Sequence, residues 1–295
     1  MLTLTRNPYH QSLILLLLTP VVWGTSFPLL KGVVADLSPG VILAVRFMVA
    51  AIAVAPWLRH AQPKLVRAGL LLGSLYFTEC ALTLTGLQTI PASRSAFIVS
   101  LNAVFVPLFS LVLGRQLSQQ ILWAAGVAVL GIGLMSWDGG GLQVGDVLTF
   151  MGAIGIAIYI LLLERIASQH PTLPLVAVQL MVMASFSTLW ALPDVFAQTQ
   201  AIATHFGTLL YVGLVITAGP IWTQALAQRW VPSYKAALIY TLEPVFAALF
   251  ASLILGEVLG PQGMVGSFLV VTAMLWSQRR DAQPAAPEIK SLQGR

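Results

Sequence analysis

The sequence predicts an all-α integral membrane protein with ten transmembrane helices, arranged as two inverted repeats of five helices each. Three observations support this prediction. Hydrophobic residues make up 58% of the 295 residues and charged residues only 8%, a balance that a soluble domain with a polar surface does not reach. Long apolar segments alternate with short connections rich in Pro and Gly. In addition, a stretch of the first half of the chain returns in the second half.

The apolar segments are long enough to be membrane spans, because a helix needs roughly 17 to 25 residues to cross the hydrocarbon core. Connections such as Ser38-Pro39-Gly40 and Asp138-Gly139-Gly140-Gly141 separate them. The predicted spans are 12–33, 39–58, 66–87, 92–113, 119–137, 143–164, 173–193, 206–228, 234–255 and 261–278. We expect residues 1–11 to be a cytoplasmic N-terminus and residues 279–295 to be a disordered cytoplasmic tail.

The internal repeat is clearest around the fourth and ninth spans. Residues 91–109 return without a gap as residues 232–250, and ten positions match or are conservatively exchanged at one constant offset. A second echo aligns residues 44–49 with residues 177–182. The sequence therefore predicts one repeat over residues 12–137 and another over 143–278. Internal duplication of this kind is typical of secondary transporters, whose substrate site lies near the membrane midplane between the repeats.

Basic residues predict the orientation, because loops rich in Lys and Arg remain in the cytoplasm. With the N-terminus inside, the basic residues fall on the cytoplasmic side except for Lys31, Arg46 and Arg94. Both termini are then cytoplasmic. Because five is an odd number, the second repeat enters the membrane in the opposite sense from the first.

Three charged residues lie at mid-depth in the predicted spans: Arg46, Glu79 and Glu243. A charge near the bilayer centre costs about 2.5 to 3.5 kcal/mol on insertion scales, so each needs a partner, a watery cavity or a function. Glu79 is either a protonatable or ammonium-binding carboxylate, or a structural partner of Arg46. Glu243, near the middle of the ninth span, is either functional or stabilises an irregular turn at Pro244. Arg46 either binds a substrate carboxylate or extends to the outer interface.

Polar and aromatic residues at mid-depth form a second group of candidates. A transporter pocket needs a few hydrogen-bonding groups on an otherwise apolar wall, with aromatic faces to cover a substrate or its ammonium group. Each of them is either a substrate contact or a helix-packing residue. The sequence alignment of the two halves places Gln179 opposite Arg46. The group consists of Trp23, Tyr76, Asn102, Tyr159, Gln179, Trp222, Gln224 and Tyr240.

The sequence lacks the residue patterns that several other classes of function require. The single cysteine, Cys80, can form no disulfide or metal cluster within the chain. The sequence has neither a Gly-x-x-x-x-Gly-Lys-Ser/Thr loop for ATP nor a His-Glu-x-x-His pattern for zinc. The net charge of +5 is spread over loops and tail, which argues against nucleic acid. We therefore expect no cofactor, and an enzyme is the least favoured class.

Several short motifs carry a resemblance to a known family. They are Trp23-Gly24-Thr25-Ser26-Phe27, Arg46-Phe47, and the run from Leu242-Glu243-Pro244-Val245-Phe246 to Leu255-Gly256-Glu257. In their order and spacing they resemble the EamA branch of the drug/metabolite transporter superfamily, over the whole chain except the tail. The resemblance implies a bacterial inner-membrane carrier of small metabolites, often an exporter of amino acids or their analogues.

The leading hypothesis is a secondary carrier that works by alternating access around a cavity lined by spans 1 to 4 and 6 to 9, with spans 5 and 10 as peripheral supports. Its expected partners are a small-molecule substrate, the lipid bilayer and protons, and it is a monomer or a homodimer. The alternative is a non-transporting membrane sensor or scaffold. Replacing Glu79 with Gln distinguishes the two, because only a carrier that uses this carboxyl group is impaired.

Overall fold

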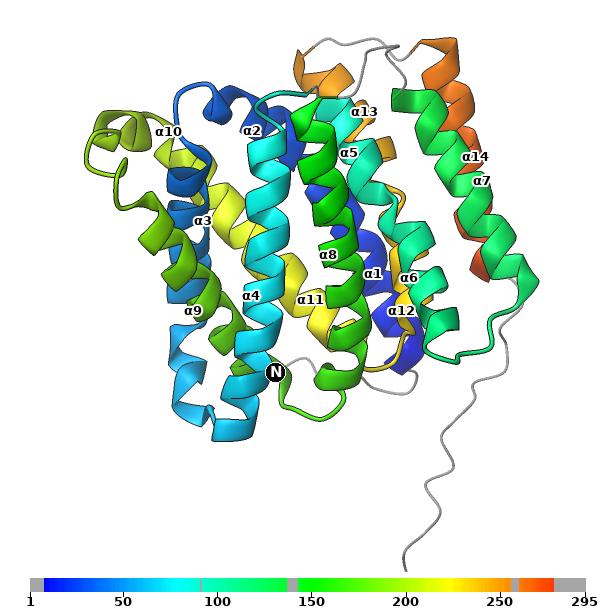
Figure 1. Ribbon diagram of the computed structural model, residues 1–295, viewed down its shortest axis with the longest axis horizontal. Coiled ribbons are helices and arrows are strands. Elements are labelled where there is room, and N and C mark those ends of the chain that lie inside the picture. The colour runs from blue at the N-terminus through cyan, green and yellow to red at the C-terminus, as the bar shows by residue number, and fades with distance from the viewer. Residues whose placement is uncertain (1–7, 91, 137–142, 256–259, 279–295) are drawn as a thin grey trace, which may run out of the picture.

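A computed structural model of the chain describes residues 8–90, 92–136, 143–255 and 260–278, and within these ranges every regular element is a helix (Figure 1). Six helical segments of this part are long and apolar enough to cross a membrane: 8–34, 39–60, 63–86, 144–167, 172–191 and 199–227. The chain is thus an all-helical, multi-pass membrane protein. The elements are α1 (Pro8–Gly24), α2 (Ser26–Val34), α3 (Pro39–Val54), η1 (Ala55–His60), α4 (Pro63–Gly86), α5 (Ala92–Ser100), α6 (Asn102–Val112), α7 (Gln119–Ser136), α8 (Val144–Ala167), α9 (Thr172–Ala191), α10 (Thr199–Tyr211), η2 (Val212–Ala218), α11 (Gly219–Ala227), α12 (Ser233–Tyr240), α13 (Glu243–Leu255) and α14 (Pro261–Gln278).

Local sequence explains where several helices begin. Pro39, Pro63 and Pro261 each occupy the first position of a helix, where the missing N–H would have had no partner in any case. Before α8, Gln143 and Asp146 form a capping box, in which side chain and backbone satisfy each other's unpaired groups. These signals account for the agreement, to within a few residues, between most predicted and observed span limits.

Two breaks in the middle of the bundle fall at equivalent positions of the two sequence copies. Helices α5 and α6 are separated at Leu101, and α12 and α13 are separated at residues 241–242. Beside each break a hydroxyl group bonds back to its own helix: Ser100 Oγ donates to the Ala96 carbonyl at 2.8 Å, and Thr241 Oγ1 donates to the Leu238 carbonyl at 2.7 Å. Non-helical backbone at membrane depth is tolerated where protein or a cavity surrounds it.

The break before α13 gives the position of Glu243 within the predicted ninth span. Glu243 does not lie within a continuous helix, because it is the first residue of α13 and Pro244 is the second. Proline suits this first turn, where no backbone hydrogen bond is lost. The carboxyl group also lies at the positive end of the helix dipole, which favours its ionised form.

A π-helical segment, η2, joins α10 to α11 in a single apolar run. In this segment Thr217 Oγ1 donates a 2.8 Å hydrogen bond to the carbonyl of Val212, five residues earlier. Such wide turns in otherwise regular helices frequently occur at functional sites. Here η2 packs against α3, the helix that carries Arg46.

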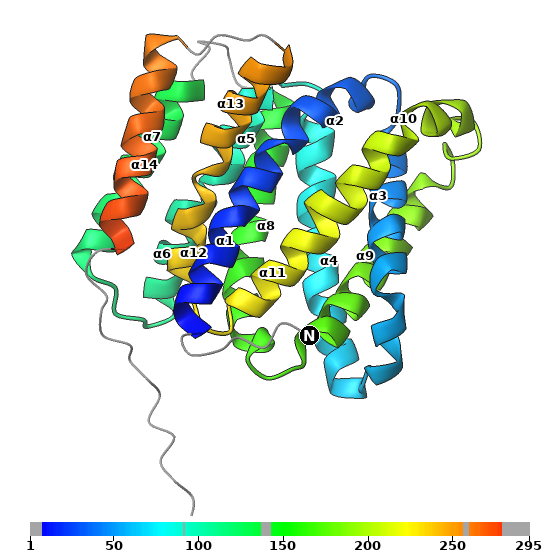
Figure 2. The same cartoon turned by 180° about the vertical axis from the view of Figure 1, so that it is seen from behind.

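The helices pack in pairs drawn from both halves of the chain. Helix α3 packs against α9, α4 packs between α8 and α9, and α1 contacts α11 and α13. Helices α7 and α14 pack on each other at one edge of the bundle (Figures 1 and 2). The contact of α4 with α9 depends on glycine: a Cβ atom at Gly73 would lie 2.7 Å from the Gln179 carbonyl oxygen.

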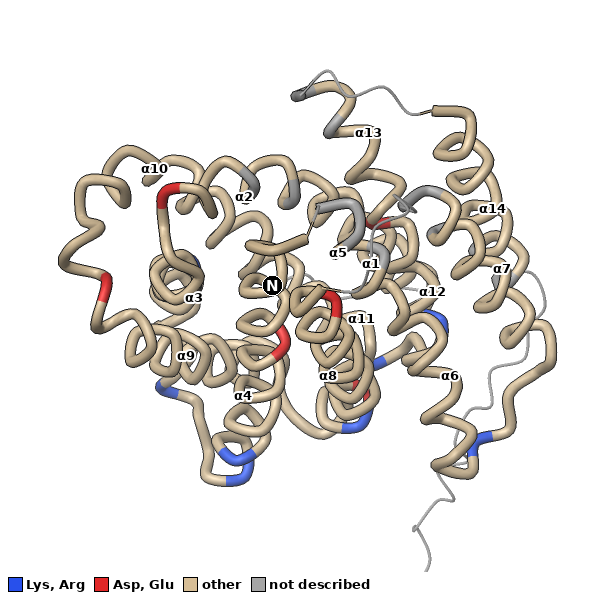
Figure 3. The backbone as a smooth tube through the Cα atoms, turned by 45° about the horizontal axis from the view of Figure 1, so that its top comes forward, with Lys and Arg blue, Asp and Glu red and all other residues tan. Residues whose placement is uncertain are grey.

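Basic residues gather at one end of the bundle (Figure 3), which we call the basic end and define by Arg59, Lys64, Arg115, Arg165 and Arg229. Arg115 Nη1 lies 2.7 Å from Glu164 Oε2 of α8, and the same carboxylate accepts a 3.2 Å bond from the Ser233 N–H. These contacts join the ends of α6, α8 and α12. The turn between α2 and α3, with Asp36, lies at the opposite end.

Candidate functional site: a charged cavity

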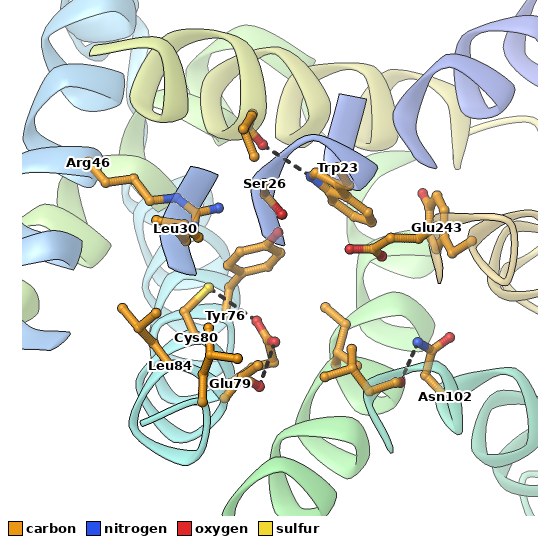
Figure 4. Close-up of a pocket in the computed structure, with 16 residues that line it drawn as sticks. Trp23, Ser26, Leu30, Arg46, Tyr76, Glu79, Cys80, Leu84, Asn102 and Glu243 are labelled. Atoms are coloured by element: carbon orange, nitrogen blue, oxygen red, sulfur yellow. Dashed lines mark hydrogen bonds between the residues drawn. The ribbon is translucent and has the colours of Figure 1, made fainter. Parts of the chain in front are cut away.

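A cavity of about 100 Å³ lies inside the bundle, between elements of both halves of the chain (Figure 4). A cavity needs only about 10 to 15 Å³ to hold one water molecule, so this one has room for several. Most of the predicted site residues line it. They are Trp23, Arg46, Tyr76, Glu79, Asn102, Tyr240 and Glu243.

Arg46 is held towards the cavity by η2. Its side chain is buried, with 9% of its surface exposed, and its Nε donates a 2.5 Å hydrogen bond to Thr217 Oγ1. Thr217 in turn donates to the Val212 carbonyl, so the π-helical turn fixes the position of the acceptor. The alternative in which Arg46 extends to the outer interface does not describe this structure, because the side chain is buried and lines the cavity (Figure 4).

Glu79 is supported by its own helix. Cys80 Sγ and Thr83 Oγ1 each donate to one oxygen of its carboxylate, both at 3.2 Å. Among the residues that the structure describes, no nitrogen of Arg46 lies within 4.0 Å of a Glu79 oxygen, so the predicted ion pair is not formed. The guanidinium and the carboxylate instead line the same cavity from α3 and α4, with space between them (Figure 4).

Two equivalent half-helix ends meet the cavity from the other side. Asn102 begins α6 and Glu243 begins α13, and both side chains line the cavity. Asn102 Nδ2 donates to the Val99 carbonyl at 2.8 Å, while Oδ1 has no partner among the described residues. Glu243 points into the space between Trp23 and Tyr76 (Figure 4) and makes no hydrogen bond within the described part of the chain. Of these two side chains, Glu243 thus leaves acceptor oxygens for a ligand, whereas the unpartnered Asn102 Oδ1 is itself buried.

Aromatic side chains supply much of the remaining wall. Trp23 packs on Tyr240 with ring centroids 5.2 Å apart, and Trp23 Nε1 donates to the Ile216 carbonyl at 3.1 Å. Tyr76 packs edge-on against Tyr159 with centroids 4.9 Å apart. Aromatic faces of this kind attract cationic groups such as an ammonium.

The other predicted site residues do not line the cavity: Tyr159, Gln179, Trp222 and Gln224. Tyr159 and Gln179 are fully buried and bonded to each other, with Gln179 Nε2 donating to the Tyr159 hydroxyl at 3.0 Å. Tyr159 stands behind Tyr76. Gln224 is also fully buried, in α11. A direct substrate contact for these residues remains a prediction.

The sequence reasoning missed three polar groups at the site. Cys80 was not among the predicted site residues, yet it lines the cavity and donates to Glu79. Ser26 and Thr83 also line the cavity. Thr83 could have been predicted from its spacing, because it follows Glu79 by four residues and side chains four apart share a helix face. Cys80 directly follows Glu79 in the sequence. Among the described residues, no group of three or more His, Cys, Asp or Glu side chains could hold a metal ion.

The arrangement can bind a small molecule that carries both kinds of charge. One guanidinium faces two carboxyl groups across a space with aromatic and apolar walls. A guanidinium pairs with carboxylate, while carboxylates and aromatic faces receive an ammonium group. Pockets with a few polar groups on an apolar wall are typical of small-molecule sites.

Comparisons with known proteins identify relatives of this chain. A transporter from Archaeoglobus fulgidus that is described as uncharacterized is 27% identical over 267 residues, covering 88% of this chain and 83% of the relative. The uncharacterized transporter YvbV of Bacillus subtilis is 27% identical over 300 residues and covers 95% of each chain. One solved crystal structure shares the fold, with a TM-score of 0.71 at 16% identity over 90% of this chain and 95% of the other.

The family comparison covers nearly the whole described chain. The model of the EamA-like transporter family matches twice, over residues 10–137 and again over residues 143–278. The family and the names of the relatives indicate a transporter rather than an enzyme. This chain therefore belongs to the EamA-like transporter family.

Proposed function

We propose that this protein is a secondary carrier that exports small metabolites, such as amino acids or their analogues, by alternating access around the charged cavity. The observation that carries the proposal is the meeting of Arg46, Glu79 and Glu243 in one cavity between the two halves of the chain. A zwitterionic substrate offers a carboxylate to Arg46 and an ammonium group to the carboxylates and aromatic rings. The cavity volume of about 100 Å³ limits the proposed substrate to a small metabolite.

We further propose that ten spans form two inverted repeats of five. Pairwise contacts between the halves support this arrangement. The α3 helix packs on α9 and α7 packs on α14, while the contact of α4 with α8 has a counterpart in the contact of α1 with α11. These are the pairs that a two-fold relation between the repeats would bring together. The family model also matches the chain twice, over residues 10–137 and 143–278, which are the two halves of the proposed repeat.

The carrier is proposed to lie in a bacterial inner membrane with both termini in the cytoplasm. The basic end then faces the cytoplasm, in agreement with the preference of Lys and Arg for cytoplasmic loops. Proton exchange at Glu79 or Glu243 would drive export. One proton moving through 100 mV supplies about 2.3 kcal/mol, enough for roughly 50-fold concentration of a neutral substrate.

Efflux from liposomes tests the proposal. The purified protein is reconstituted into liposomes that contain a mixed pool of amino acids and other small metabolites, and efflux is followed by mass spectrometry with and without a pH gradient. We expect selective loss of a few compounds, accelerated by the gradient. If a folded, monodisperse preparation releases nothing faster than protein-free liposomes, the carrier function is wrong and a sensor or scaffold is favoured.

Matched variants link the activity to the cavity. Glu79→Gln and Glu243→Gln each remove one carboxylate from the lining, whereas Asp194→Asn removes a carboxylate outside it. We expect the first two variants to lose rate or gradient dependence and the third to behave as the wild type. Equal activity of all three would contradict a role for the cavity carboxylates.

A further inference from the structure

Three buried glutamines lie close to the charged cavity but outside it: Gln179 of α9, Gln224 of α11, and Gln228 just after α11. Gln179 and Gln224 are completely buried, and Gln228 is 2% exposed. Within the described residues, Gln179 Oε1, Gln228 Oε1 and both side-chain polar atoms of Gln224 have no hydrogen-bond partner. Buried amides are almost always paired, so three neighbouring exceptions call for an explanation.

Helix α8 gives the position of these residues relative to the cavity. Ile156 lines the cavity, Tyr159 follows nearly one turn later, and the Ile160 carbonyl accepts a 3.2 Å bond from Gln228 Nε2. Another turn on, Glu164 pairs with Arg115 at the basic end. Eight residues of helix separate Ile156 from Glu164, a rise of about 12 Å. Gln228 therefore lies in a layer between the cavity and the basic end, and Gln224 precedes it by about one helical turn.

Tyrosines close this layer from the cavity. Tyr76 and Tyr240 line the cavity, and Tyr159 stands directly behind Tyr76. Gln179 bonds to the far side of this group, through the Tyr159 hydroxyl, and its backbone lies against Gly73, one turn before Tyr76. The Tyr240 hydroxyl is itself without a partner among the described residues. Polar atoms without partners thus continue from the cavity wall towards the basic end.

A purely structural role does not explain these side chains. A buried polar atom without a partner destabilises the state in which it is buried, and an apolar side chain of the same size would pack there without that cost. In this state neither Nε2 nor Oε1 of Gln224 has a hydrogen-bond partner among the described residues. The residues make physical sense if another state of the protein brings hydrogen-bonding groups to them.

We propose that Gln179, Gln224 and Gln228 form a second polar subsite, which receives the hydrogen-bonding groups of the substrate after it passes the tyrosine layer towards the basic end. This inference rests on the proposed carrier function. Uncharged amides both donate and accept hydrogen bonds. The subsite therefore suits a substrate whose charges have been matched in the cavity, because it binds polar groups without adding a charge that would hold the substrate back.

Cysteine labelling tests the position of the subsite. Since Cys80 is the only cysteine, Gln224→Cys is made in a Cys80→Ser background, and because Cys80 lines the cavity, Cys80→Ser alone is the reference for efflux and labelling. In liposomes, a membrane-impermeant sulfonated maleimide should modify Gln224→Cys only from the side of the basic end. A saturating concentration of the compound identified by efflux should slow this reaction at least fivefold. Thr149→Cys is the matched control, because Thr149 is also buried with an unpartnered hydroxyl but lies on α8 away from the glutamines, and it should not react.

Modification from the opposite side, no modification, or a rate that the substrate does not change would overturn the proposal.

A second pair of variants gives an independent measurement. Gln224→Met should keep the thermal midpoint of the wild type or raise it while lowering the initial efflux rate at least tenfold, whereas Thr149→Val should change neither. Efflux by Gln224→Met within twofold of the wild type would also overturn it. Failure of the carrier function would be distinct, because the wild type itself would then release no compound.

Discussion

Replacing Gly73 with alanine tests how closely α4 must approach α9. Helix α4 carries Tyr76, Glu79 and Cys80 into the cavity, so its position governs the site. A Cβ atom at residue 73 would lie 2.7 Å from the Gln179 carbonyl oxygen and 2.9 Å from Val182 Cβ, where ordinary contact begins at 3.4 Å. Because the nearest atom belongs to the backbone of a helix, it cannot rotate away. The two helices would have to separate locally by about 0.7 Å, the difference between 3.4 and 2.7 Å.

The expected cost follows from two opposing terms. Overpacking of a well-packed interface costs about 1 to 3 kcal/mol, and a gap of 0.5 to 1 Å forfeits roughly a quarter to a half of each dispersion contact. Alanine is favoured over glycine within a helix by about 1 kcal/mol. We therefore expect Gly73→Ala to lower the free energy of unfolding by about 0 to 2 kcal/mol.

Gly126 of α7 is the control, because a Cβ atom there would meet nothing within 4 Å. Gly126→Ala receives only the helix-propensity term, so the two variants should differ by about 1 to 3 kcal/mol. Thermal unfolding in detergent, followed by tryptophan fluorescence, measures both proteins under one condition. If Gly73→Ala is as stable as Gly126→Ala, the interface is looser than the structure indicates and the reasoning is refuted.

Three further predictions concern the charged groups and the cysteine. Cys80 should react with 2-aminoethyl methanethiosulfonate, and the substrate identified by efflux should slow this reaction; equal labelling rates with and without substrate would contradict its place in the cavity lining. Arg46→Gln should weaken substrate binding by about 1.5 to 3 kcal/mol, the worth of a hydrogen bond to a charged group. Thr217→Val, which keeps that charge, should cost only about 0.5 to 1.5 kcal/mol, and both are measured by titrating the substrate-induced thermal shift. Arg115→Gln should lower the free energy of unfolding by no more than about 1 kcal/mol, because the pair with Glu164 is partly exposed, and thermal unfolding checks this.

The sequence predicted the depth of the candidate site residues better than the direction in which they point. Arg46, Glu79 and Glu243 were chosen because charge is rare within apolar spans, and all three line one cavity. Gln179 and Gln224 were chosen by the same reasoning and lie outside it. Depth can be read from the position of a residue within its span. Direction requires a polar face, and a helix surrounded by apolar side chains and lipid has none.

The sequence predicts only one of the two breaks in the helices. Pro244 indicated irregular backbone near Glu243, and the break before α13 lies there. The equivalent break at Leu101 has no adjacent proline, since Pro107 lies inside α6, and no residue next to it predicted a break. The break there depends on tertiary surroundings, which accept the free backbone groups next to a cavity.

The π-helical turn makes chain length, and not only residue identity, a determinant of the site. Each residue of a helix advances it by about 100°. Removing one residue from η2, for example the partly exposed Val215, would give a regular helix and rotate α11 by roughly that angle relative to α10. Thr217 would turn away from Arg46, and Gln224 and Gln228 would turn away from α8. Many single substitutions here would be absorbed by packing, whereas a single deletion would separate Thr217 from Arg46 and turn every side chain of α11 around the helix axis.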